Sequence, residues 1–150
     1  MPTTRTHGDL FELGLPALAH GCNCRGSMAG GIALQFQARW PDMARAYRER
    51  CLAGDFQLGD VMPWETPEGL VVYNLATQVE TGADARLDAI DTTVRAALVD
   101  AERRGLDRLG VPRIGAGIGG LDWADVREVL HRAGDESPVE LVVVTRPRGS

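Results

Sequence analysis

The 150-residue sequence predicts an α/β fold, with a mixed sheet covered by helices on both faces. Short apolar runs of strand length alternate with segments that have the apolar period of a helix. The run ELVVVT near the C-terminus lacks the alternation of a half-exposed strand, so both of its faces are expected to be covered. The length suits one domain, and we expect residues 1–150 to form it.

The first half of the chain contains signals for four strands and two helices. Ile32, Phe36 and Trp40 recur four residues apart, which places them on one face of a helix. Pro41 suits the first turn of a second helix, where the N–H that proline lacks has no partner in any case. The expected helices are Gly31–Trp40 and Pro41–Gly54, and the expected strands are Thr3–His7, Ala17–Asn23, Asp60–Trp64 and Leu70–Ala76.

The second half opens with the most regular helix signal. Apolar residues follow the helical period over Arg86–Arg104, and Gly105 is a typical helix stop. A strand at Leu109–Ile114, a short helix at Asp122–His131 and a last strand at Val139–Thr145 complete the alternation.

Composition excludes several classes of protein. The net charge of −5 argues against broad, charge-driven binding of nucleic acid. No apolar run approaches a membrane span and no signal segment opens the chain, so we expect a cytoplasmic location. Cys22, Cys24 and Cys51 form no C-x-x-C pair, which favours reduced thiols over a metal site. All 16 basic residues are arginines, a bias that suggests a GC-rich bacterial genome.

Two glycine-rich loops each follow an expected strand and open an expected helix. The second, RIGAGIGGLDW, has the G-x-G-x-x-G spacing of dinucleotide-binding folds at Gly115, Gly117 and Gly120. Too few strands and helices follow it for a Rossmann unit. With the first loop, NCRGSMAGGIALQF, it would surround one crevice with backbone N–H groups, which suits a diphosphate. Either loop alone could also be a plain turn.

Motifs spread along the chain resemble those of the macrodomains, which bind ADP-ribose. The resemblance is strongest to the branch that contains the terminal ADP-ribose protein glycohydrolase and the antitoxin macrodomains that reverse DNA ADP-ribosylation. It implies a three-layer α/β/α macrodomain with a mixed central sheet over residues 1–150. The matching segments are Gly8–Phe11, Ala19–His20, Met28–Ala33, Tyr73–Thr77 and Pro112–Gly117, with Leu121 and Trp123.

The resemblance also implies roles in ligand binding. Asp9 aligns with the acid that accepts a hydrogen bond from the adenine amine, and Asn23 lies where related proteins place an amide near the distal ribose. The two glycine loops would close over the diphosphate from opposite sides. The expected ligand-binding residues are Asp9, Leu10, Asn23, Ser27, Met28, Ala29, Gly30, Gly31, Ile32, Thr77, Gln78, Gly115, Ala116, Gly117, Ile118, Gly119 and Gly120. No metal and no cofactor are expected.

The sequence departs from the family pattern in its catalytic residues. The glycohydrolase it resembles uses a lysine and an aspartate at the positions of Gln78 and Gly119. This chain contains no lysine, which excludes a covalent lysine mechanism. If the protein is a hydrolase, water is then the nucleophile, and we expect Arg86 and Asp88, together with Asn23, to assist it. Alternatively, Asp88 only stabilises a helix N-terminus and Arg86 is a surface charge.

The function expected from the resemblance is hydrolysis of mono-ADP-ribose from glutamate and aspartate side chains of proteins. Their ester at the anomeric carbon is the most labile of the linkages considered. The expected partners are ADP-ribose and mono-ADP-ribosylated proteins, bound by a monomer, without a membrane; the acidic balance disfavours nucleic acid. Two alternatives stay open: a reader that binds ADP-ribose without cleaving it, and a phosphatase acting on ADP-ribose 1″-phosphate.

Overall fold

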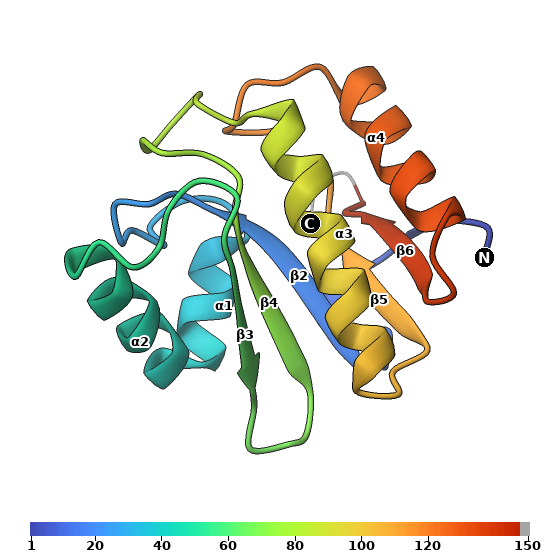
Figure 1. Cartoon of the computed structure of the whole chain (residues 1–150), viewed down its shortest axis with the longest axis horizontal. Helices are drawn as coiled ribbons and strands as arrows, with labels where there is room; N and C mark the ends of the chain where they lie inside the picture. The colour runs from blue at the N-terminus through green and yellow to red at the C-terminus, as the bar shows by residue number, and fades with distance from the viewer. Residues whose placement is uncertain (148–150) are drawn as a thin grey trace.

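A six-stranded sheet lies at the centre of the molecule, and the computed structural model describes residues 1–147 (Figure 1). The strand order is β1-β6-β5-β2-β4-β3, in which β3 runs antiparallel to β4 and the other pairs are parallel. The expected mixed sheet is therefore confirmed. The strands are β1 Thr4–His7, β2 Ala17–Cys22, β3 Val61–Glu65, β4 Val71–Ala76, β5 Arg108–Val111 and β6 Glu140–Thr145.

Helices cover both faces of the sheet, as expected from the sequence. The pair α1 and α2 lies on one face, and the pair α3 and α4 lies side by side on the other (Figure 1). A short 3₁₀ helix at Leu10–Glu12, which the sequence analysis did not predict, follows β1. The helices are α1 Ala33–Arg39, α2 Pro41–Leu52, α3 Leu87–Arg103 and α4 Trp123–Asp135. Within residues 1–147, none is long and apolar enough to cross a membrane.

Strand β6 contributes side chains to both hydrophobic cores, one on each face of the sheet. Leu141 and Val143 belong to the core beneath α3 and α4, whereas Val142 and Val144 belong to the core beneath α1 and α2. Alternate side chains of a strand point to opposite faces, so a strand buried on both sides has no polar positions to alternate. This explains the uninterrupted apolar run ELVVVT.

Two element ends differ from the expectation for physical reasons. β5 ends at Val111 rather than at Ile114, because Pro112 has no N–H to donate to the ladder. α4 continues to Asp135 rather than ending at His131. Its last turn packs against the start of the chain, where the Thr3 hydroxyl donates to His131 O at 3.2 Å. The single-domain organisation of residues 1–150 stays a prediction.

Candidate functional site

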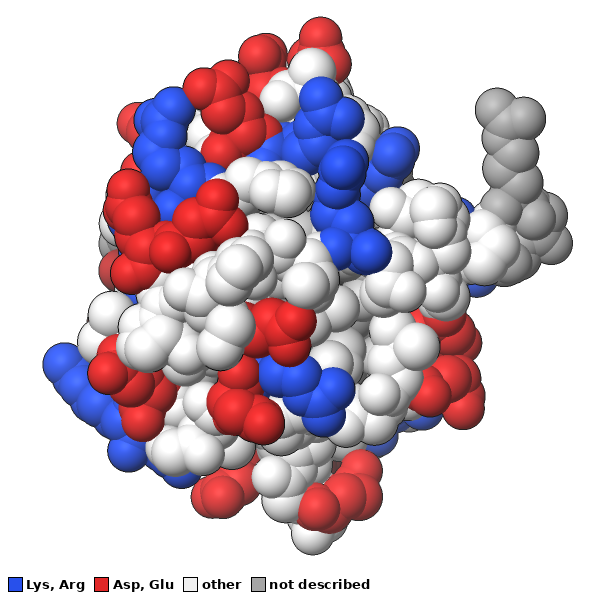
Figure 2. Space-filling view, turned by 90° about the vertical axis from the view of Figure 1, so that its right-hand side faces the viewer, with Lys and Arg blue, Asp and Glu red and all other residues white. Residues whose placement is uncertain are grey.

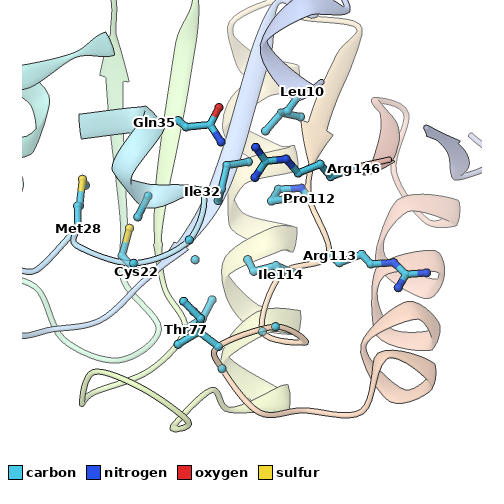
Figure 3. Close-up of a pocket in the computed structure, with 18 of the residues that line it drawn as sticks. Leu10, Cys22, Met28, Ile32, Gln35, Thr77, Pro112, Arg113, Ile114 and Arg146 are labelled. Carbon is cyan, nitrogen blue, oxygen red and sulfur yellow. The ribbon is translucent and has the colours of Figure 1, made fainter. Parts of the chain in front are cut away.

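A cavity of about 1040 Å³ opens at the carboxyl edge of the sheet (Figure 3). The residues that follow each of the parallel strands line it, namely Gly8 after β1, Asn23 after β2, Thr77 after β4, Pro112 after β5 and Arg146 after β6. Ligands of open α/β sheets bind at this edge, and the cavity is large enough for a nucleotide-sized molecule.

The first glycine loop is held in shape by the side chain of Asn23. Its Oδ1 accepts hydrogen bonds from Arg25 N at 2.9 Å and Ser27 N at 3.3 Å, and its Nδ2 donates to Ser27 O at 2.9 Å. The Tyr47 hydroxyl lies 2.9 Å from the same Oδ1. Asn23 lines the cavity, but its amide already organises the loop. Its expected catalytic role stays a prediction.

The loop after β4 is joined to the first glycine loop. Thr77 N and Gln78 N donate to Cys22 O at 3.1 and 3.4 Å, and Cys24 N donates to Val79 O at 3.0 Å. On the outer side, the exposed side chains of Arg25 and Glu80 form a two-pronged ion pair. Hydrogen bonding to Arg25 lowers the pKa of the Glu80 carboxyl. The two loops thus form one continuous wall of the cavity.

The same loop folds around the side chains of Gln78 and Asp84. Gln78 Nε2 donates to Glu80 O at 2.6 Å and Gly82 O at 2.9 Å, and the Asp84 carboxylate accepts from Val79 N and Glu80 N. Because both partners of the Gln78 amide are carbonyl oxygens, only the nitrogen can occupy that position. The orientation of this amide is therefore determined by its neighbours.

The second glycine loop closes tightly upon itself. A Cβ at Gly119 would lie 2.7 Å from Gly115 O and 2.8 Å from Ala85 Cβ, closer than real side chains approach. Leu121 N donates to Gly115 O at 2.9 Å, and Ala85 N donates to Gly119 O at 3.2 Å. Position 119 therefore has no room for an aspartate in this loop conformation.

The two glycine loops meet through the side chain of Ile118. This side chain is 60% exposed, and its Cδ1 would lie 3.1 Å from a Cβ at Gly30 and 3.4 Å from one at Gly31. All three residues line the cavity, from opposite loops. Ile118 therefore bridges the space in which the ligand is expected.

Most of the expected ligand-binding residues share this cavity. Of that set, Ala116 and Gly120 alone are absent from its lining. Both lie in the second glycine loop, in which Gly115, Gly117, Ile118 and Gly119 do line the cavity. Contact of the other residues with a ligand stays a prediction, but the structure brings them together as the sequence indicated.

The structure does not bring Arg86 and Asp88 into the cavity. They line a separate shallow depression with Asp91 and Val129 at the start of α3. Arg86 forms an ion pair with Asp84 at 3.2 Å, and Asp88 lies in the first turn of the helix. The chain leaves the cavity after Gly82, and Ala85 already lines the separate depression, so the helix start lies outside the cavity. Their expected catalytic role has no geometric support.

Several residues that line the cavity escaped the sequence analysis, notably Gln35, Thr81, Arg113 and Arg146. Figure 3 shows Arg146 reaching between Leu10, Ile32 and Pro112, whereas Arg113 points away. The Arg113 guanidinium instead lies over the Trp123 ring, 4.6 Å from its centre. Arg146 could have been predicted from its position, because it directly follows a strand that ends at the carboxyl edge of the sheet.

Few ionisable side chains line the cavity. Within residues 1–147, the lining residues that carry one are Asp9, Cys22, Arg146 and Arg113, whose side chain points away. Burial raises the pKa of the Cys22 thiol far above its usual value, so this thiol stays protonated and is a poor nucleophile. Asp9 caps the short 3₁₀ helix, since its Oδ1 accepts from Phe11 N at 2.9 Å.

His20 lies beneath the cavity, in the core on the α1 and α2 side of the sheet. Its ring stacks on Phe36 with centres 3.9 Å apart, and Nε2 lies 2.7 Å from Asn74 Oδ1. Burial lowers the pKa of His20 to about 4, so the ring is neutral at physiological pH. A buried, neutral ring of this kind is part of the core rather than a catalyst.

Comparison with known proteins assigns this architecture to a family. The model of the Macro domain family matches residues 19–130, which include both glycine loops. The chain belongs to the macro domain family. The sequence resemblance and the expected α/β/α macrodomain fold are both confirmed.

The most similar relatives of this macrodomain act on ADP-ribose compounds, by their names. The DNA ADP-ribosyl glycohydrolase of Mycobacterium tuberculosis is 34% identical over 95% of this chain, which spans 41% of that protein. The solved macrodomain of M. tuberculosis DarG is 31% identical, with a TM-score of 0.86 over 95% of this chain and 97% of that one. An ADP-ribose 1″-phosphate phosphatase of Candida albicans is 27% identical over 83% of this chain and 88% of the fungal protein.

Proposed function

We propose that this macrodomain binds ADP-ribose and releases it by hydrolysis from a modified macromolecule, with water as the nucleophile. The observation that carries the proposal is the cavity itself, lined from opposite sides by two glycine loops whose backbone groups suit a diphosphate. Relatives named as a glycohydrolase and as a phosphatase support hydrolysis of an ADP-ribose compound. The chain spans about two fifths of the glycohydrolase it matches, so its activity is inferred from the site.

The substrate that suits this site best is an ester between ADP-ribose and a glutamate or aspartate side chain. Among residues 1–147, the cavity lining contains no lysine, histidine or glutamate that could protonate a leaving group. The one carboxyl in that lining belongs to Asp9, which precedes Leu10 in the chain, and Figure 3 shows Leu10 at the opposite end of the cavity from Thr77. A departing carboxylate is a stable anion and needs no proton, whereas an alcohol or a ring nitrogen leaves as a much stronger base.

ADP-ribosylated DNA is the second candidate, favoured by the names of the most similar relatives. The charge distribution gives this candidate no further support. Figure 2 shows acidic side chains flanking the basic ones on that face of the molecule. In α3 and α4, Arg95 is paired with Glu136 and Arg132 with Glu128, whereas Arg103 and Arg127 form no ion pair among residues 1–147. The carboxylates interspersed among these cations would repel the phosphates of a duplex.

A substrate panel tests the proposal. The protein is incubated with a peptide that carries ADP-ribose on glutamate, with ADP-ribosylated DNA and with ADP-ribose 1″-phosphate, and the products are followed by mass spectrometry. We expect fastest release from the glutamate ester. Faster release from DNA would replace the preferred substrate, and release of phosphate alone would make the protein a phosphatase. Tight binding of ADP-ribose without any product would identify a reader.

A further inference from the structure

Thr77 presents a hydroxyl group to the cavity from a buried position. The residue directly follows β4, is 1% exposed and lines the cavity. Its Oγ1 has no hydrogen-bond partner within residues 1–147. A Cβ at Gly21 would lie 2.7 Å from this oxygen and 3.0 Å from Ile114 Cγ1. Gly21 in β2 therefore leaves the space in which the Thr77 and Ile114 side chains converge (Figure 3).

In Gln78, the next residue, the amide nitrogen is hydrogen-bonded and the amide oxygen is not. Its Nε2 uses both hydrogens on Glu80 O and Gly82 O. Its Oε1 has no hydrogen-bond partner among the described residues. A side chain held at one end in this way presents its free acceptor in a single orientation, and ordering it on ligand binding costs little further entropy.

The backbone around these two residues is also fixed. Thr77 N and Gln78 N both donate to Cys22 O, and Arg86 N donates to Thr77 O at 2.9 Å. Two other polar side chains of this wall are occupied, since the Asn23 amide holds the first glycine loop and the Asp84 carboxylate holds its own loop. Two consecutive residues of the cavity lining, Thr77 and Gln78, thus each carry a side-chain oxygen with unused hydrogen-bonding capacity.

We propose that Gln78 Oε1 and Thr77 Oγ1 hold the water that attacks the anomeric carbon in the hydrolysis proposed above, on which this inference rests. Each oxygen accepts one hydrogen of that water, which leaves a lone pair of the water free for the carbon. Positioning of a nucleophile by hydrogen bonds needs no titrating group, and a glutamine performs this task for water in GTP hydrolysis by Ras-type enzymes.

The reaction balances without an added cofactor. The water oxygen forms a bond to the anomeric carbon as the bond from that carbon to the ester oxygen breaks, and the electron pair of that bond goes to the leaving carboxylate. The attacking water then loses one proton to the carboxylate or to solvent. Neither an amide nor a hydroxyl changes its protonation at neutral pH, so Thr77 and Gln78 end the cycle as they began it.

Near-isosteric variants test the inference. Thr77→Val removes the hydroxyl, and Gln78→Met removes the amide oxygen while keeping the length of the side chain. We expect each to slow single-turnover release from the glutamate ester by roughly 10- to 1000-fold, with the dissociation constant of ADP-ribose within about threefold of wild type. Thr77→Ser, which keeps the oxygen, should restore most of the rate. Thr93→Val is the matched control, because Thr93 is equally buried but donates within α3.

The outcomes separate this inference from the proposed function. If the wild type is active and both variants keep full rates, the inference is overturned and the hydrolase stands. Parallel losses of rate and affinity that Thr77→Ser does not restore would make the two residues structural and also overturn it. A wild type inactive on every substrate would overturn the proposed hydrolase together with the inference. In ¹⁸O-labelled water, we expect the label in the ADP-ribose product; label in the glutamate carboxylate would move the attack to the acyl carbon and overturn it.

Discussion

Asp9 uses one carboxylate oxygen for a hydrogen bond within the chain, and its other oxygen is available to a ligand. Oδ1 caps the 3₁₀ helix by accepting from Phe11 N, whereas Oδ2 has no partner within residues 1–147. Asp9→Ala should weaken binding of ADP-ribose by about 1–3 kcal/mol, the cost of losing a hydrogen bond to a charged group. Asp9→Asn keeps an oxygen for the cap and should lose less. Calorimetric titration measures both; an unchanged affinity in Asp9→Ala would exclude the expected contact with adenine.

His20 makes stability depend on pH. Its pKa in the folded protein is about 4, below the ordinary value of 6.5, so protons bind the unfolded chain more readily. The contribution of His20 to the free energy of unfolding is fully present above pH 6.5. It declines as the pH falls towards 4, by at most about 1.4 kcal/mol per pH unit. Urea unfolding at pH 7.5, 6 and 5 checks this.

The control for His20 is a variant that cannot take up the proton. In His20→Phe the slope between pH 6.5 and 5 should become shallower, whatever the absolute stability. Carboxyls with lowered pKa values, such as Glu80 and Asp84, act at lower pH, since their stabilisation is lost below their ordinary values near 4.5 and 3.8. An identical slope in both proteins would assign the dependence to other groups.

At the scale of the element, the second glycine loop can be probed at two neighbouring glycines. A Cβ at Gly119 would collide with Gly115 O and Ala85, whereas a Cβ at Gly117 meets nothing within 4 Å. We expect Gly119→Ala to lower the free energy of unfolding by about 1–3 kcal/mol through overpacking. Gly117→Ala should change it far less. Urea unfolding of both variants decides; equal effects would show that the loop adapts freely to a side chain.

The elements predicted best from the sequence are those whose spacing of apolar residues matches the face that they bury. α3 differs from the expected Arg86–Arg104 by one residue at each end, because its apolar stripe extends along almost the whole helix. The end of α4 depends on contact with Thr3, more than a hundred residues away, and no local pattern contains that contact. The two glycine loops were recognised because glycine spacing is itself a local signal.

The misplaced part of the site has a similar cause. Whether Arg86 faces the cavity depends on how the preceding loop folds, and that loop is shaped by hydrogen bonds of Gln78 and Asp84. A sequence pattern shows that a helix begins near residue 86 but not in which direction its first turn points. Thr77 could be placed beside the ligand because it directly follows a strand.

At the scale of the whole molecule, the cavity is assembled from every parallel strand, so its occupant should stabilise the entire fold. ADP-ribose at a hundred times its dissociation constant should raise the free energy of unfolding by about 2.7 kcal/mol. NAD, which carries a further ring on the distal ribose, should stabilise far less at the same concentration. Thermal unfolding with each ligand measures the difference; equal shifts would contradict a cavity closed around the distal ribose.

The contact between Ile118 and the first glycine loop should slow the association and dissociation of the ligand. A ligand that lies between the loops must displace this side chain when it enters and again when it leaves. The association rate constant should therefore fall well below the diffusional ceiling of about 10⁸–10⁹ M⁻¹s⁻¹ for a small ligand. Ile118→Ala should speed entry and escape together, which stopped-flow mixing would detect, while the ratio of the two rates changes little. How long one ADP-ribose molecule stays bound is then governed by the parting of two loops.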